Sequence, residues 1–294
     1  MVMPNRARAA LLTACVLWAV SFVATKVALE AAPPLVVVTL RLTISAVCFL
    51  PWIAATGGTS ALGGSRGLFR LFLLSPFGTS LHYSLQTVGL QFTTASNASL
   101  YTTTGPITIL LLSALFLGER ITTRKAVGVA VAVAGVLVVM GSETLTSFEF
   151  GNVKGDLLVL ASLVMWGLFT VYGKKMIDQL GALRVTAWVT VIGALTMIPV
   201  GWAEARATGF SLTEITAEAW FAIAFLGVAC SFLATLLYFV ALGLSESQKV
   251  GVYLYTIPPM TAVVAALYLG ETITANLVIG AMLVIGGVAL TERG

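Results

Sequence analysis

A single histidine is the first residue in this sequence whose chemistry stands out. His82 is the only histidine in the chain, and it lies beside Tyr83 in the middle of a long apolar stretch. An ionisable group in such surroundings is a candidate for function, because a cell membrane or protein interior tolerates it only at a cost. An imidazole could bind a carboxylate or take up a proton. The alternative is a neutral histidine that is hydrogen-bonded to a neighbouring helix.

Aromatic and polar side chains occur at similar depths in several other apolar stretches. Trp18 and Trp166 lie near the middle of their stretches, whereas tryptophans that anchor a protein at a membrane interface lie near the ends. A buried indole or phenol needs a hydrogen-bond partner, which a polar cavity would provide. Ordinary helix packing is the alternative. The predicted cavity residues are Trp18, Ser21, His82, Tyr83, Asn97, Tyr101, Trp166, Tyr238, Tyr253 and Tyr255.

Prolines interrupt two of the apolar stretches, at "YTTTGPIT" (101–108) and "YLYTIPPMT" (253–261). A proline inside a helix lacks an N–H group and frees the carbonyl one turn earlier. Within a bilayer, that carbonyl needs a partner or a wet cavity. We therefore predict a helix break or hinge, with a simple packing kink as the alternative. The residues concerned are Gly105, Pro106, Pro258 and Pro259.

Lys26, Arg41 and Lys174 are three of the cations that lie inside or at the ends of apolar stretches. Lys26 and Lys174 occupy equivalent places after a tryptophan, and we consider them candidate gate cations that attract anionic groups. Reaching out to the membrane interface would explain each of them equally well. For Arg41, two turns into its stretch, we favour the interfacial explanation.

The elements that must position these residues are membrane helices. The 294 residues are 59% hydrophobic and 10% charged, with a mean hydropathy of +1.01. Soluble chains are typically about 45–50% apolar and about 25% charged. A spanning helix needs about 20 mainly apolar residues. The runs of suitable length lie at 9–29, 34–55, 68–90, 95–117, 124–141, 155–174, 183–202, 217–241, 246–269 and 275–291.

Ten spans place both termini on the same side of the membrane. Most of the 16 Lys and Arg residues fall in the termini and in alternate connections, whereas Lys26, Lys154 and Arg206 fall in the others. Because cytoplasmic loops are enriched in Lys and Arg, we predict cytoplasmic termini in an inner-membrane, multi-pass protein.

The sequence contains a long internal repeat. "LFLGERIT" before residue 123 returns as "LYLGETIT" before residue 275, and "WAVSFVATK" (18–26) returns as "WGLFTVYGK" (166–174). These echoes predict two five-helix units, residues 1–145 and 150–294. Since five is odd, the second unit is inverted relative to the first. Inverted repeats suit a transporter, because two such halves can open a central site to either side in turn.

Other repeated residues have structural explanations. Gly118 and Gly270 suit helix C-caps, Thr122 and Thr274 suit N-caps, and Glu119 and Glu271 lie between them. We therefore interpret "LGE" as the end of one helix and the start of the next. Close helix packing is predicted in the fifth and tenth spans at Gly128, Gly135, Gly280, Gly286 and Gly287.

Twin units with a Trp–Lys first helix and a Pro-broken fourth helix ending in "LGE" resemble the EamA-type drug/metabolite transporter superfamily. The resemblance covers nearly the whole chain. It implies ten helices, of which the first, third, fourth, sixth, eighth and ninth line a central cavity. The fifth and tenth would support the bundle, and the second would be peripheral. It also implies movement of small metabolites, often outward and often amino acids.

These features together predict an exporter of amino acids with aromatic or other apolar side chains, acting by alternating access. An exporter of other small amphiphiles is the runner-up. An enzyme is disfavoured because mid-span carboxylate pairs, phosphate loops and metal-ligand clusters are missing from the sequence, and a channel is disfavoured by the repeat. We expect no cofactor, no metal and no nucleic acid. The expected partners are a small-molecule substrate and the lipid bilayer, with the monomer as the working unit.

Overall fold

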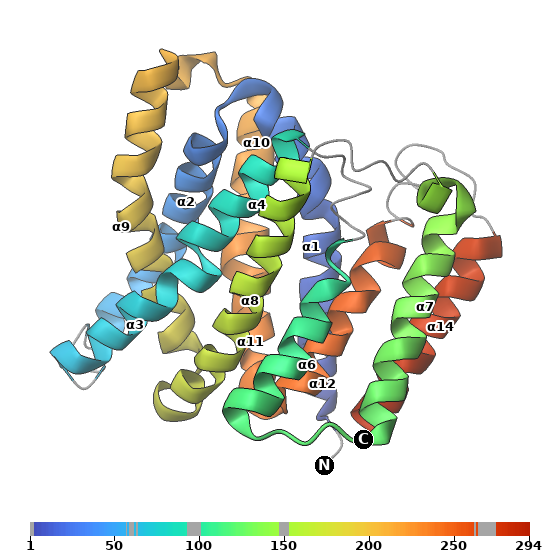
Figure 1. Ribbon diagram of the computed structural model, residues 1–294. Helices are drawn as coiled ribbons and strands as arrows, with labels where there is room; N and C mark the ends of the chain where they lie inside the picture. Colours follow the sequence, from blue (N-terminus) through green and yellow to red (C-terminus); the bar gives the residue numbers. More distant parts are fainter. Residues whose placement is uncertain are drawn as a thin grey trace.

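The structure, a computed structural model, describes residues 3–56, 58, 62, 64–92, 101–146, 153–261, 263 and 275–294. Throughout these residues the chain is helical, without a β-strand. The helices run side by side, and both termini lie at the same end of the bundle (Figure 1). We call this end the terminal end. The α6–α7 and α8–α9 connections lie there too, whereas α9 joins α10 at the opposite end (Figure 1).

Most elements follow the predicted apolar runs. The first half contains α1 (Asn5–Ala31), α2 (Pro34–Ala55), α3 (Ser65–Gly78), α4 (Ser80–Phe92), α6 (Thr104–Leu117) and α7 (Thr123–Thr146). The second half contains α8 (Val153–Leu180), α9 (Ala182–Thr208), η2 (Leu212–Glu214), α10 (Ala217–Phe225), η3 (Leu226–Ala234), α11 (Thr235–Leu244), α12 (Ser247–Gly251), η4 (Val252–Thr256) and α14 (Ala275–Glu292).

Among the described residues, six helices are long and apolar enough to cross a membrane. They are α1, α2, α8, α9, the continuous helix Ala217–Leu244 and α14. Large apolar side chains cover their outward faces, and Phe221 is 77% exposed. Such a surface is costly in water but suits the hydrocarbon of a bilayer. The total of ten spans remains a prediction.

Several predicted spans are not uniform α-helices. The third is divided at Thr79 into α3 and α4, three residues after Pro76. The eighth is continuous but passes through η3, a stretch of wider π-helix. The ninth starts as α12 and tightens into a 3₁₀ stretch, η4, before Pro258.

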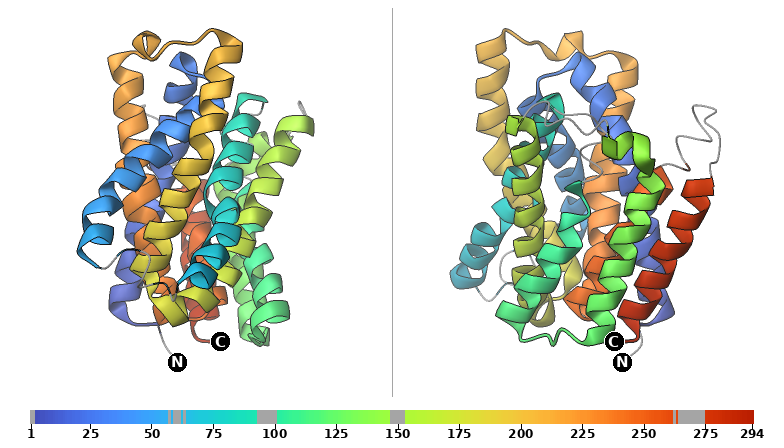
Figure 2. Two further views of the ribbon diagram at one scale, coloured as in Figure 1. Left: turned by 90° about the vertical axis from the view of Figure 1, so that its left-hand side faces the viewer. Right: turned by 45° about the vertical axis from the view of Figure 1, so that its right-hand side comes forward.

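Helices from the two halves pack against each other in a regular set of pairs. α2 lies along α9, α4 along α8, and α1 along α10, η3 and α11. α6 packs on α12 and η4, and α7 lies beside α14 (Figure 2). Each pair therefore joins an element of the first half with one of the second, and the core lies between the halves.

The α7–α14 contact brings two backbones close together. A Cβ atom on Gly135 would lie 2.7 Å from the Gly280 carbonyl oxygen, and one on Gly287 would lie 2.5 Å from that of Gly128. The predicted glycine packing is therefore confirmed at these four positions. It is wrong for Gly286, because a Cβ there would meet no described atom within 4 Å.

Candidate functional site

A cavity opens between the halves of the bundle. It contains about 560 Å³ of empty space, part of which belongs to its open mouth. α1, α2, α4 and α8 contribute to its wall, together with residues just before the two proline breaks. The lining residues are Trp18, Ser21, Phe22, Arg41, His82, Tyr83, Gln86, Thr102, Leu163, Trp166, Leu254 and Ile257.

An aromatic cluster forms one wall of this cavity. The rings of Trp18 and Trp166 meet edge to face, with centroids 5.3 Å apart. Tyr238 lies behind both of them, at 5.4 Å and 5.3 Å, and its hydroxyl is hydrogen-bonded to Thr170. Because each ring packs against the others, the side chains have little freedom to move. The wall is therefore a rigid apolar surface with polar groups at the ring edges.

His82 belongs to the same cluster. Its ring centroid lies 5.2 Å from that of Trp166, and its Nδ1 lies 2.8 Å from the Ser162 carbonyl oxygen. A carbonyl can only accept, so Nδ1 carries the proton and Nε2 of the neutral ring is an acceptor. His82 therefore has a helix neighbour as its partner and lines the cavity as well.

The structure separates the other predicted cavity residues. Trp18, Ser21, His82, Tyr83 and Trp166 line the cavity, whereas Tyr238 lies behind the wall. Tyr101 and Tyr255 are buried elsewhere in the core. Tyr253 points away, since its hydroxyl donates to Glu292, which also pairs with Arg8. Asn97 lies outside the described residues, as do Gly270, Glu271 and Thr274 of the second "LGE" motif.

Arg41 is the main lining residue that the sequence did not identify. Its interfacial explanation is wrong, because the side chain is 2% exposed and lines the cavity. Its Nε donates to Ser231 Oγ at 2.9 Å, and its guanidinium carbon lies 4.0 Å from the centre of the Tyr83 ring. The second span is therefore part of the cavity wall, and is not peripheral as the family resemblance implied.

The π-helical stretch η3 supports the cavity from behind. Ser231, the partner of Arg41, lies in it, and the carbonyl of Cys230 accepts from Trp18 Nε1 at 3.4 Å. π-Helical turns are rare and occur frequently at functional sites. Two lining side chains of the first half are thus held by one irregular segment of the second.

The two proline breaks have matching geometry. Thr102 and Leu254, four residues before Pro106 and Pro258, both line the cavity. A proline cannot donate to the carbonyl four residues earlier. Each carbonyl accepts instead from the N–H three residues later. Since a carbonyl oxygen has two lone pairs, that of Leu254 can accept a second hydrogen bond.

A second match concerns the threonines beside these breaks. Thr104 Oγ1 donates to the Tyr101 carbonyl at 2.8 Å, and Thr256 Oγ1 donates to the Tyr253 carbonyl at 2.7 Å. The same local bond therefore stabilises both breaks. Among the other residues predicted to form the breaks, Gly105 and Pro259 are buried but do not line the cavity.

Neither candidate gate cation lines the cavity. Lys26 Nζ donates to the carbonyl of Leu90. Lys174 forms an exposed ion pair with Asp178 one turn along α8, at 3.0 Å. Such pairs are typical of helix surfaces.

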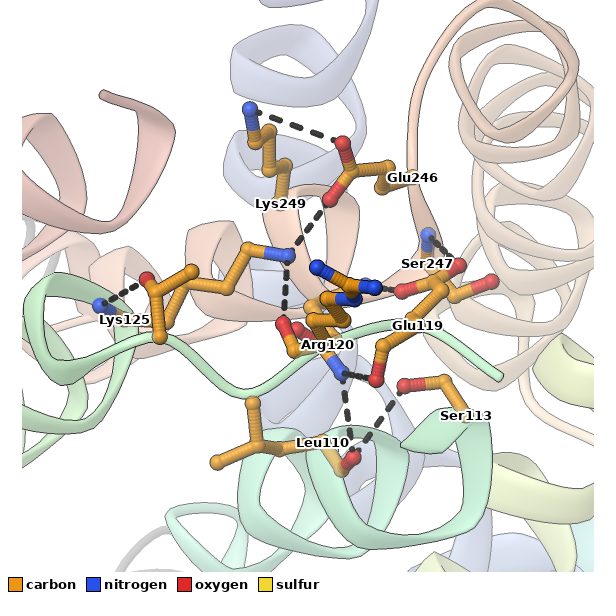
Figure 3. Close-up of polar contacts among 10 residues, drawn as sticks. Leu110, Ser113, Glu119, Arg120, Lys125, Glu246, Ser247 and Lys249 are labelled. Atoms are coloured by element: carbon orange, nitrogen blue, oxygen red, sulfur yellow. Dashed lines mark hydrogen bonds and ion pairs between the residues drawn. The ribbon is translucent and has the colours of Figure 1, made fainter. Parts of the chain in front are cut away.

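At the terminal end, Glu119 joins the two halves. Gly118 ends α6 in the left-handed conformation with φ +68°, and Thr122 Oγ1 accepts from Lys125 N at the start of α7, as predicted. Glu119 itself caps a different helix. Its carboxylate accepts from the backbone N–H groups of Ser247 and Gln248, at 2.8 Å and 3.0 Å, at the start of α12 (Figure 3).

Glu246 adds ion pairs beside that cap. It contacts Lys125 of α7, and Lys249 Nζ lies 3.7 Å from its Oε1 (Figure 3). Both lysines are 3% exposed. Burial raises the pKa of Glu246, but the hydrogen bond and charge of Lys125 and the charge of Lys249 outweigh it, so the pKa is lowered overall. We call Glu119, Lys125, Glu246, Ser247 and Lys249 the terminal clamp.

Comparison with known proteins identifies the family to which the chain belongs. A model of the EamA-like transporter family matches residues 6–141 and again residues 153–293. The chain belongs to the EamA-like transporter family. The family resemblance seen in the sequence is thereby confirmed, and this EamA-like transporter is a multi-pass membrane protein.

Relatives match over nearly their whole length. An uncharacterized transporter of Archaeoglobus fulgidus is 30% identical over 94% of this chain and 93% of its own. The uncharacterized transporter YvbV of Bacillus subtilis is 30% identical, over 98% and 92%. A probable terminal-alkyne amino-acid exporter of Streptantibioticus cattleyicolor is 28% identical, over 97% and 92%.

A solved crystal structure has the same fold. It superposes with a TM-score of 0.80, covering 98% of this chain and 96% of the other, at 21% identity. At that identity, the likeness concerns the arrangement of the helices alone.

Proposed function

We propose that this EamA-like transporter exports amino acids with aromatic or other apolar side chains across the inner membrane. The observation that carries the proposal is the cavity, where the Trp18–Trp166 wall stands beside a small set of polar groups. Ligand sites are typically apolar clefts with few, well-placed polar groups. The aromatic wall would hold the substrate side chain.

The polar groups suit the ammonium group of an amino acid. His82 Nε2 is an acceptor, and Leu254, a lining residue beside the second proline break, has a carbonyl with a second lone pair. These groups would accept the ammonium hydrogens. The name of the Streptantibioticus relative, a probable amino-acid exporter, favours the same substrate class.

Alternating access would use two inverted five-helix units, residues 1–145 and 150–294. The pairing of helices across the halves and the matching proline breaks support this. Related halves can exchange conformations and open the cavity to either side. Gly105, Pro106, Pro258 and Pro259 would be the places where the fourth and ninth spans bend.

The terminal clamp would close one side of the pathway. Its residues join the α6–α7 connection and α7 to the start of α12 through a helix cap and ion pairs, and these contacts support closure of that side. The excess of Lys and Arg near the termini favours a cytoplasmic location for this end. The clamp would then open to admit substrate from the cytoplasm.

Efflux from proteoliposomes tests the proposal. The purified protein is reconstituted with labelled phenylalanine inside, and efflux is followed with unlabelled amino acids, a nucleotide sugar or a cationic dye as competitors. Saturable efflux that other amino acids inhibit is expected. An imposed pH gradient in the same experiment tests proton coupling.

Transport of the dye without amino-acid efflux would reject the substrate class and favour the second candidate, an exporter of other small amphiphiles. The largely apolar lining of the cavity is the observation that favours this candidate. Liposomes without protein give the background leak.

A further inference from the structure

Arg41 is a buried cation whose charge is not balanced by any described carboxylate. None of the ion pairs among the described residues includes it, although the side chain is 2% exposed. An uncompensated charge at such a position is strongly unfavourable. A residue of this kind inside a membrane span is therefore expected to have a partner that binds there.

The guanidinium group is held in a fixed orientation. Ser231 Oγ accepts from Nε at 2.9 Å, and the Tyr83 ring covers one face at 4.0 Å. The terminal nitrogens of Arg41 have no hydrogen-bond partner in the described part of the chain, and the residue lines the cavity. These nitrogens form the part of the fork that can bind a planar anion at two points.

We infer that Arg41 binds the carboxylate of the transported molecule. The inference rests on the proposed function only in taking this cavity as the substrate site. A carboxylate matches the guanidinium fork in shape and balances its single charge. A phosphate fits less well, because Arg41 is the only Lys or Arg among the described lining residues.

The rest of the cavity defines the remainder of the substrate. Phe22, Leu163, Trp166 and Ile257 give apolar surface, and no described lining residue is acidic. The ligand class is therefore a monocarboxylate with an apolar or aromatic body. The ammonium group of an amino acid is compatible with this site but is not its main anchor.

Ligand binding to the purified full-length protein tests the inference directly. Tryptophan fluorescence is a suitable signal because Trp18 and Trp166 line the cavity. The probes are phenylalanine, 3-phenylpropionate, phenethylamine, phenylalaninamide and phenyl phosphate. We expect the two carboxylates to bind at least roughly tenfold more tightly than the amine and the amide, as hydrogen bonds to charged groups predict.

The comparison of the five probes on the wild-type protein tests the inference even if a variant does not fold. Equal binding of phenethylamine and 3-phenylpropionate, tighter binding of phenyl phosphate than of either carboxylate, or no binding of any probe would overturn the inference. Arg41→Gln is expected to remove the preference for the acids, and Arg41→Lys to retain part of it. Unchanged acid binding in Arg41→Gln would also overturn it.

Arg206→Gln is the matched control. Arg206 is likewise stacked on an aromatic ring, with its guanidinium carbon 4.9 Å from the centre of Trp202, but it is exposed and outside the cavity. This variant should keep the wild-type ratio of affinities. Ser231→Ala, which frees Nε, should weaken the acids without affecting the amine.

Two further combinations separate this inference from the proposed function. If 3-phenylpropionate binds through Arg41 but no amino acid leaves proteoliposomes, amino-acid export fails and the carboxylate site stands. If phenylalanine is exported but phenylalaninamide competes equally well and Arg41→Gln transports normally, export stands and the role of Arg41 fails.

Discussion

Trp166 connects the packing of the core with the surface of the cavity. Its ring lies within 5.5 Å, centroid to centroid, of Trp18, His82, Phe169 and Tyr238, and the residue lines the cavity. Each aromatic pair contributes about 0.5–1.5 kcal/mol beyond the area that it buries. A change at this position is therefore expected to affect both the packing of the wall and the binding of the proposed substrate.

Trp166→Phe tests this residue without emptying the wall. The smaller ring keeps an aromatic face but loses part of the contact with Trp18 and His82. We expect substrate affinity to fall roughly two- to tenfold, which is the loss of about one aromatic contact. Concentration-dependent efflux of labelled phenylalanine measures it. Trp202→Phe, at an exposed tryptophan, should be neutral, and equal effects of both would contradict the assignment.

Residue types alone predicted part of the cavity lining that forms the candidate site. Trp18, His82 and Trp166 could be found because a polar aromatic group in mid-span is unusual. Arg41 could not, since its meaning depends on which face of α2 turns inward and on Ser231, which is 190 positions away. Tyr253 was predicted wrongly for the same reason, because only the fold brings Glu292 to its hydroxyl.

At the scale of elements, two neighbouring glycines of α14 allow a matched test of its close contact with α7. Alanine at Gly286 or Gly287 should improve helix propensity by about 1 kcal/mol in each case. The Cβ of Gly287→Ala would collide with the Gly128 carbonyl, whereas that of Gly286→Ala meets open space. We expect a lower unfolding temperature for Gly287→Ala and an unchanged or higher one for Gly286→Ala. Equal shifts would contradict the close contact.

The terminal clamp gives a pH-dependent contribution to stability. Because the pKa of Glu246 is lowered in the folded protein, its ion pairs stabilise fully above the ordinary glutamate value of 4.5. That contribution is lost as the pH falls through the lowered pKa. Glu246→Gln should therefore lower the unfolding temperature at pH 7, and the difference from wild type should shrink toward zero in acid.

Thermal unfolding from pH 7 downward measures this difference. The effect will be modest, because the Glu246 side chain is 42% exposed and water screens its charge. Glu30→Gln, at an exposed position near the end of α1, is the control. A difference that stays constant at every pH would show that the shape of Glu246 matters and its charge does not.

Helix positions were largely predictable from hydropathy, but irregular segments were not. The apolar runs located the ends of α1, α2, α8, α9 and α14 to within six residues. They could not reveal η3 or the break at Thr79, because hydropathy does not record which N–H group bonds to which carbonyl. Among these irregular segments, only the 3₁₀ stretch before Pro258 had a local sequence signal, which was the proline itself.

At the scale of the whole molecule, the position of the termini makes a prediction about orientation. Both lie at the terminal end (Figure 1), so protease-sensitive tags on the N- and C-termini should behave alike. We expect both tags to be protected in cells with an intact inner membrane and digested in inverted vesicles. A cysteine at exposed Ser211, in the α9–α10 connection, should react with an impermeant maleimide from outside.

Different behaviour of the two tags would require an odd number of spans. Digestion of both from outside would keep the even number but reverse the orientation. The even number of spans and the cytoplasmic termini are predictions from sequence. They follow from the internal repeat and from the distribution of Lys and Arg, which can both be read without knowledge of contacts.

The ion pair between Arg8 of α1 and Glu292 of α14 gives the bundle one more property. It links the start of the first helix to the end of the last helix, so the two ends of the chain lie close together. Circular permutation is well tolerated where the termini adjoin. A permuted chain could begin at α8 and pass from α14 into α1 through a short linker, with every helix contact kept. Its new ends would then emerge on the opposite side of the membrane.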